Sequence, residues 1–244
     1  MPSSSPNSIP RSSTDMNLAI VGYGKMGRLI EQLAPEYGFR VALKLDEFNN
    51  PNGEAMTAEN FHGVGVAVEF STPHTVVDNI ERLAALGVNT VVGATGWTDQ
   101  LDRVRAAVEK AGTGLVWSPN FSIGVNVFFR LVSEAARLLA TEPAYAAWGW
   151  EIHHGAKKDA PSGTLLKLVE EMKKAGYERP VDTGSNRAGF HPGTHEIGFD
   201  SAADTITLRH AARNREGFAR GALKAAQWVA GKKGLFEFSN VLFG

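Results

Sequence analysis

The chain has 244 residues, of which 43% are apolar and 21% are charged, the composition of a globular protein with a sizeable core. The 25 Lys and Arg residues against 26 Asp and Glu residues give a net charge of -1, which argues against a nucleic-acid partner or a polybasic membrane surface. The absence of cysteine excludes disulfides, thiolate metal sites and cysteine nucleophiles. No apolar run approaches the roughly 18 residues of a membrane span. We therefore expect a cytoplasmic protein.

The first residues are rich in Ser and Pro and contain no apolar segment, so they do not resemble a secretory signal. We expect residues 1–15 to form a disordered extension, since such a composition cannot bury a core.

From residue 17 onward, apolar strands alternate with amphipathic helices, which predicts an α/β fold with a parallel sheet. The expected strands span residues 18–21, 39–45, 66–70, 88–92, 115–117, 148–152 and 204–213. One helix is expected after the glycine-rich turn at residue 22, and the others at 75–86, 99–111, 124–140, 161–174 and 217–229, with Ser122 as a cap and Pro161 at a first helical position. Residues 180–203 give no clear pattern.

The pattern changes near residue 120, which predicts two domains. We expect a Rossmann-like doubly wound parallel sheet built from residues 16–120 and 214–244. Residues 121–213 then form an inserted α+β domain.

A glycine-rich motif, Gly22-Tyr23-Gly24-Lys25-Met26-Gly27, follows the first expected strand and opens a helix. In a dinucleotide-binding turn, the first glycine permits the tight turn and the second lets the backbone approach a pyrophosphate. The third allows close packing, and the N–H groups of the helix start bind the phosphates. The other interpretation is a turn that only links strand and helix.

An acidic residue, Asp46, ends the second expected strand about 20 residues beyond the motif, where a dinucleotide site needs a ribose partner. Glu47 beside it would repel a 2′-phosphate, which favours NADH, whereas Lys25, Arg28 and Lys44 act in the opposite direction. We expect NADH as the preferred cofactor, with NADPH as the alternative.

Two further loops follow expected strands, at the strand ends where open α/β sheets bind ligands. They are Gly93-Ala94-Thr95 and Ser118-Pro119-Asn120-Phe121. Each is equally well explained as a turn between a strand and a helix.

The densest group of reactive side chains spans residues 151–164. His153 or His154 can donate a proton near neutral pH. Lys157 and the helix start at Gly163 and Thr164 offer positive charge and N–H groups to a carboxylate.

Neighbouring strand residues point to opposite faces, so the two histidines need not share one site. A metal site made by His153, His154 and Asp159 with His191 or His195 is the other interpretation. Adjacent histidines without an i, i+4 partner do not favour it, and we assign no metal.

The segment Glu-x-His-His-x-x-Lys-x-Asp-Ala-Pro-Ser-Gly-Thr at 151–164, together with the glycine motif, resembles the dihydrodipicolinate (4-hydroxy-tetrahydrodipicolinate) reductase family of lysine and diaminopimelate biosynthesis. Residues 120–126 and 221–228 extend the resemblance, which covers the chain from about residue 17 to its end.

The resemblance implies a role for each matching residue. His153 corresponds to the proton donor and Lys157 to the catalytic lysine, while His154, Gly163 and Thr164 correspond to substrate-binding residues. The glycine motif, Asp46 and the two loops correspond to cofactor contacts. The implied reaction is hydride transfer from NAD(P)H to C4 of a small cyclic dicarboxylate, followed by protonation of the enamine. The family also implies a homotetramer formed through the sheets of the substrate domain.

Two other functions remain open on the same scaffold: an amino-acid dehydrogenase and a nucleotide sensor without catalysis. The intact His153 and Lys157 argue against both. The chain departs from the family pattern in three places. Lys25 stands where arginine is frequent, and Thr72 stands where some members have arginine. The glycine motif is also one residue tighter than the common form. These departures concern the choice of cofactor.

Overall fold

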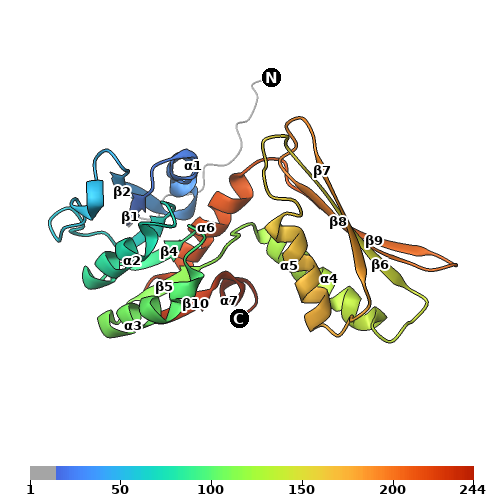
Figure 1. Ribbon diagram of the computed structural model, residues 1–244. Helices are drawn as coiled ribbons and strands as arrows, with labels where there is room; N and C mark the ends of the chain where they lie inside the picture. The colour runs from blue at the N-terminus through green and yellow to red at the C-terminus, as the bar shows by residue number, and fades with distance from the viewer. Residues whose placement is uncertain (1–14) are drawn as a thin grey trace, which may run out of the picture. The chain divides into compact units, whose positions relative to one another are not determined.

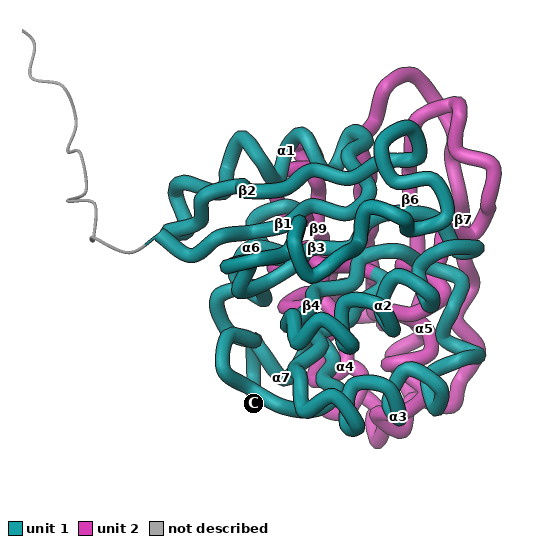
Figure 2. Tube along the Cα trace, turned by 90° about the vertical axis from the view of Figure 1, so that its left-hand side faces the viewer, with its two compact units in different colours: residues 1–119, 219–244 teal, residues 120–218 magenta. Residues whose placement is uncertain are grey.

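The computed structural model describes residues 15–244, so the expected disordered extension lies outside the described residues except for Asp15. The chain divides into two compact units (Figure 2). Unit 1 runs to Pro119 and resumes at Ala219–Gly244, and unit 2 is Asn120–Phe218. Within the described part of the chain, none of the helices has the length and apolarity needed to cross a bilayer.

Unit 1 contains a six-stranded sheet in which every paired strand is parallel, in the order β10-β5-β4-β3-β1-β2. The strands are β1 (Met16–Val21), β2 (Phe39–Leu45), β3 (Val66–Glu69), β4 (Asn89–Val92), β5 (Gly114–Trp117) and β10 (Gly234–Glu237). Because the order reverses at β1, the carboxyl ends of β1 and β3 flank the switch point, where doubly wound sheets bind ligands. The expected Rossmann-like fold is confirmed.

The helices of this unit are amphipathic segments that cover the sheet, and α2 and α3 pack side by side (Figure 1). They are α1 (Lys25–Leu33), α2 (Val76–Ala85), α3 (Leu101–Ala111), α6 (Glu216–Val229) and α7 (Phe238–Phe243), with short 3-10 turns at Ala34–Tyr37, Pro51–Gly53 and Thr98–Gln100. The first three residues of α6 belong to unit 2 and the rest to unit 1. The glycine after α3, Gly112, has φ 67°, a left-handed conformation that ends the helix.

The returning helix α6 is tied to the turn after α1. Arg220 pairs with Glu36 at 2.7 Å, and Gln227 donates to the carbonyl of Tyr37 at 2.7 Å. The strand that follows, β10, pairs with β5 and so completes the edge of the sheet. Strand β10 and helix α7 are not predictable from the sequence, because four and six residues are too few to show a periodic pattern.

Unit 2 is a four-stranded mixed sheet in the order β7-β6-β8-β9, with two helices packed on one face (Figure 1). Its elements are α4 (Ile123–Leu139), β6 (Ala146–His153), α5 (Gly163–Lys174), β7 (Val181–Arg187), β8 (Thr194–Asp200) and β9 (Thr205–Ala211). The buried core between sheet and helices includes Phe128, Val132, Leu165, Leu168, Met172, Ile197 and Phe199. The unassigned residues 180–203 therefore contain β7 and β8.

Strand β6 alternates strictly, which decides where its side chains go. Glu151 and His153 are buried on the face that carries the helices. Trp148 and Trp150 lie on the other face, each beside a cross-strand glycine, Gly198 and Gly184 respectively.

The start of α5 corrects one expectation. The helix begins at Gly163 and not at Pro161, because Ser162 is its cap: the Ser162 hydroxyl accepts the N–H of Leu165 at 3.3 Å. The expected cap of α4 is confirmed, since Ser122 accepts the N–H of Val125 at 3.3 Å.

Candidate functional site

The turn between β1 and α1 has the geometry of a phosphate-binding turn. Gly22 has φ 93°, and a Cβ there would lie 2.4 Å from the carbonyl carbon of Phe70, so only glycine fits. A Cβ on Gly27 would lie 2.6 Å from the oxygen of Gly22. A Cβ on Gly24 would meet no atom within 4 Å, and no side chain caps the helix start. Open space at Gly24 next to uncapped N–H groups fits a dinucleotide pyrophosphate.

Asp46 is held in a tight loop at the end of β2. Its Oδ1 accepts the N–H groups of Phe48 and Asn49 at 2.9 and 3.1 Å. The neighbouring Lys44 pairs with Glu31 at 2.9 Å, and the Tyr23 hydroxyl donates to the same carboxylate. The bonds from Tyr23 and Lys44 lower the pKa of Glu31. The charge of Lys44 is therefore already balanced.

The two other predicted loops have different surroundings. Gly93 follows β4, where a Cβ would overlap the ring of Phe70, and its N–H donates to the carbonyl of Glu69 at 2.8 Å. Ser118 and Pro119 follow β5 in unit 1, whereas Asn120 and the buried Phe121 belong to unit 2.

A buried acid that the sequence analysis missed ends β3. Glu69 is fully buried, and its Oε1 accepts from the N–H of Ser71 and the amide of Asn79, both at 3.2 Å. Its Oε2 has no hydrogen-bond partner among residues 15–244. Burial raises the pKa of Glu69 to about 7. The only sequence signal is an acid inside an apolar strand.

Replacing Glu69 with glutamine is expected to stabilise the protein above neutral pH. Because the folded pKa lies above the ordinary value of 4.5, the native state holds a proton that the unfolded state has lost, and stability falls between pH 4.5 and about 7. The slope reaches about 1.4 kcal/mol per pH unit. Urea unfolding at several pH values should show the advantage of Glu69→Gln growing over this range and staying constant above it. A pH-independent difference would contradict the assignment.

In unit 2, Glu151 is the centre of a buried polar group. Its Oε1 accepts the N–H of Ser162 at 2.8 Å, the hydroxyl of Ser185 at 2.9 Å and Nη2 of Arg187 at 2.8 Å. Arg187 also donates to the main-chain oxygen of Asp159. Burial alone raises the pKa of Glu151, but the bonds from Ser162, Arg187 and Ser185 lower it to about 2. Glu151 is therefore an anion.

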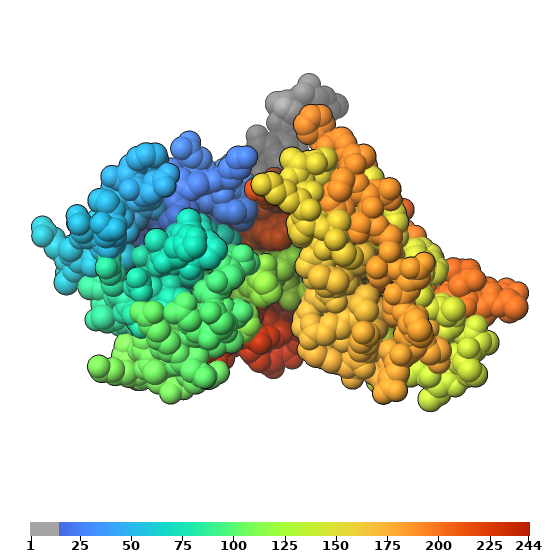
Figure 3. Space-filling model, in the orientation of Figure 1, coloured from blue at the N-terminus to red at the C-terminus, as the bar shows by residue number. Residues whose placement is uncertain are grey.

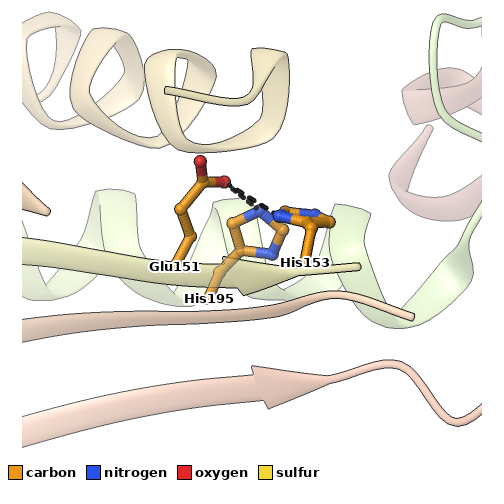
Figure 4. A group of neighbouring side chains, drawn as sticks. All are labelled: Glu151, His153 and His195. Carbon is orange, nitrogen blue, oxygen red and sulfur yellow. Dashed lines mark ion pairs between the residues drawn. The ribbon is translucent and has the colours of Figure 1, made fainter. Parts of the chain in front are cut away.

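Two histidines face the other oxygen of this carboxylate (Figure 4). Nδ1 of His153 and Nε2 of His195 each lie 3.3 Å from Glu151 Oε2, and the two rings are 5.0 Å apart edge to face. His195 Nε2 is also 3.0 Å from the Ser162 hydroxyl. Burial lowers the pKa of both histidines, and burial together with the charge of His153 lowers that of His195 to about 4.

The residues considered as metal ligands from the sequence do not all lie together. Among the described residues, the possible ligands that cluster are Glu151, His153 and His195, without His154 or Asp159. His154 lies just beyond the end of β6 and is half-buried.

Beyond β6, the loop to α5, in the yellow part of the colour range, lies at the surface (Figure 3). It carries the predicted Lys157, whose side chain is 24% exposed. Lys157 Nζ lies 2.7 and 2.9 Å from the two carboxylate oxygens of Asp159. The pKa of Asp159 is lowered first by Lys157 and also by the N–H of Gly163. A Cβ on Gly163 would meet no atom within 4 Å. Lys157 and the start of α5 thus form a surface that already holds one carboxylate.

Comparison with known proteins identifies the family. The sequence matches the family models "Dihydrodipicolinate reductase, N-terminus" over residues 16–121 and "Dihydrodipicolinate reductase, C-terminus" over residues 124–242. It is 33% identical to the 4-hydroxy-tetrahydrodipicolinate reductase of Christiangramia forsetii, covering 93% of this chain and 98% of the relative. It is also 33% identical to the enzyme of that name from Archaeoglobus fulgidus, covering 93% and 100%.

A solved structure shares the fold. Dipicolinate-bound dihydrodipicolinate reductase from Paenisporosarcina sp. TG-14 has a TM-score of 0.75 and 24% identity, covering 91% of this chain and 97% of that one. The two family models together span nearly the whole described chain, and the curated relatives match it over almost their full length. The chain belongs to the dihydrodipicolinate reductase family, whose members are pyridine-nucleotide-dependent oxidoreductases.

Proposed function

We propose that this protein reduces 4-hydroxy-tetrahydrodipicolinate, or its dehydrated form, to tetrahydrodipicolinate. The observation that supports this most directly is in unit 2: a carboxylate-binding lysine, Lys157, follows a buried His153 paired with an anionic Glu151. A dicarboxylate substrate needs cationic and N–H donors, and an enamine carbon needs an acid.

When bound, a dihydronicotinamide would supply the hydride that C4 of the substrate accepts. Lys157 then balances the charge of a substrate carboxylate, for which it exchanges its present partner, Asp159. The N–H groups of Gly163 and Thr164, at the start of α5, bind the carboxylate oxygens. His153 gives its proton to the enamine carbon, and His154 contacts the substrate from the end of β6.

We propose NADH as the preferred reductant. The glycine motif, Asp46 and the loops at 93–95 and 118–121 would hold it. Asp46 and Glu47 put negative charge where a 2′-phosphate would lie, and the ion pair with Glu31 already balances the charge of Lys44.

The test is oxidation of NADH with substrate made in situ by a dihydrodipicolinate synthase. We expect turnover that depends on the synthase, and a higher kcat/KM with NADH than with NADPH. A clear preference for NADPH would contradict the cofactor assignment. No turnover with either cofactor, combined with oxidation of diaminopimelate or aspartate by NAD, would favour the amino-acid dehydrogenase. Binding of NADH without any turnover would favour the sensor.

We also propose a homotetramer assembled through the sheets of unit 2. The face of β6 opposite the helices carries Trp148 and Trp150, whose side chains are only half-buried within the subunit. Light scattering coupled to size-exclusion chromatography is expected to give about four times the subunit mass of 26.3 kDa. A monomer mass at micromolar concentration would contradict the proposal.

A further inference from the structure

We propose that Glu151 is a positioning residue for proton transfer: its Oε2 accepts the Nδ1–H of His153, so that the proton His153 gives away is the one on Nε2. The role in transfer rests on the proposed function, whereas the contact between the two side chains does not.

The first observation is a pair of buried atoms that lie close together and make no hydrogen bond among the described residues; His195 Nε2 is the other group near Glu151 Oε2, at 3.3 Å. Glu151 Oε2 and His153 Nδ1 both lack a hydrogen bond within the described part of the chain, and they lie 3.3 Å apart. Buried polar atoms are almost always satisfied in folded proteins. His195 Nε2 has the Ser162 hydroxyl at 3.0 Å as a further partner, whereas His153 Nδ1 has only Glu151 Oε2 near it among the ion pairs and hydrogen bonds of the described residues, so Oε2 is the acceptor for His153 Nδ1.

The second observation is that the carboxylate cannot turn away. Its other oxygen, Oε1, is held by donors from two further segments: Ser162 at the start of α5, and Ser185 and Arg187 on β7. These bonds fix the plane of the carboxylate and leave Oε2 directed at the histidines (Figure 4).

The third observation concerns the opposite ring nitrogen. A Cβ on Gly193 would lie 2.9 Å from His153 Nε2, so the glycine keeps that side of the ring free of a side chain. Nδ1 is fully buried although the His153 side chain is 10% exposed, so an acceptor has to approach the rest of the ring, where Nε2 is the remaining nitrogen.

The charges around His153 come from four segments. On β6, Glu151 raises its pKa, and in the following loop Asp159 raises it while Lys157 lowers it. Arg187 on β7 lowers it, and burial lowers it most. His195 on β8 is the second imidazole at the same oxygen. The anion of Glu151 is therefore the largest influence that keeps His153 able to hold a proton.

The test compares Glu151→Gln with Glu151→Asp, and with Ser185→Ala as the matched control, because Ser185 bonds only to Oε1. The glutamine amide can still accept at one atom but cannot accept at both. We expect Glu151→Gln to lower kcat about 10- to 100-fold with little change in KM, and to move the alkaline limb of the kcat profile to lower pH. Glu151→Asp keeps the negative charge but withdraws the carboxylate by one methylene group, so it should move the pH profile less than Glu151→Gln does. Ser185→Ala should keep the wild-type pH profile. Assays in EDTA exclude a bound metal as the cause.

Histidine-selective ¹⁵N NMR gives a readout without turnover. Neutral His153 in the wild type is expected to carry its proton on Nδ1, with the resonance assigned by its loss in His153→Gln. A proton on Nε2 in the neutral wild type, or an unchanged pH profile in folded Glu151→Gln, would overturn the proposal. If Glu151→Gln does not fold, the wild-type spectrum decides. If the wild type does not turn over the substrate, the proposed function fails while the spectrum still decides the contact.

Discussion

Replacing Lys157 with alanine is expected to lower kcat/KM by about 10²- to 10³-fold, the usual cost of losing one preorganised electrostatic partner. The substrate of the proposed reaction is a dianion, and Lys157 is a cation of the loop before α5, where it shares the Asp159 carboxylate with the N–H of Gly163 at the start of that helix. Steady-state kinetics with substrate made in situ measures the loss. Binding of NADH should stay near the wild-type value, because the glycine motif lies in unit 1.

The neighbouring Lys158 provides a matched control. It is exposed, carries the same charge and differs by one position in the same loop. Lys158→Ala is expected to keep kcat/KM within about twofold, since exposed charges contribute little to a local site. Equal losses in the two variants would mean that only the net charge of the loop matters, and would contradict a specific role for Lys157.

A second substitution, at Asp159, tests the same role of Lys157. In Lys157→Ala its carboxylate loses its ion-pair partner and repels the incoming dianion. Adding Asp159→Asn should therefore recover part of the loss in KM but little of the loss in kcat. The two changes are coupled through one contact, so their effects should not add.

The sequence predicts much of the fold because its strands and helices carry regular patterns. Apolar runs and residue spacing predict β1, β2 and the glycine turn, and the structure confirms these elements. β7 could not be predicted, because its residues, VDTGSNR, are polar and largely exposed and show no alternation. It becomes a strand by pairing with β6 over its whole length, which is a tertiary effect.

The polar group around Glu151 could be predicted only in part for the same reason. The motif at 151–164 singles out His153 and Lys157, but the donors to Glu151 from Ser185 and Arg187 lie 34 and 36 residues further along the chain. Their role depends on the unpredicted β7. His195, considered only as a metal ligand, shares the carboxylate through β8.

Two glycines of the same motif are expected to differ in how much stability the protein loses when each is replaced by alanine. Gly22→Ala should destabilise unit 1 by about 2–5 kcal/mol, because the added Cβ would lie 2.4 Å from the backbone of Phe70 at a φ of 93°. Gly24→Ala should cost about 1 kcal/mol or less, because its Cβ meets no protein atom within 4 Å and φ is -86°. Urea unfolding measures both.

Although Gly24→Ala should change the stability little, it should weaken the binding of NADH. The methyl group of Gly24→Ala occupies the space where the backbone has to approach a pyrophosphate, so the Kd for NADH should rise at least about tenfold in a protein of nearly normal stability. Fluorescence titration with NADH gives the Kd. No protein atom lies within 4 Å of a Cβ on Gly24, so only a bound ligand can clash with the methyl group. Wild-type affinity for NADH in Gly24→Ala would therefore mean that the pyrophosphate does not bind next to Gly24.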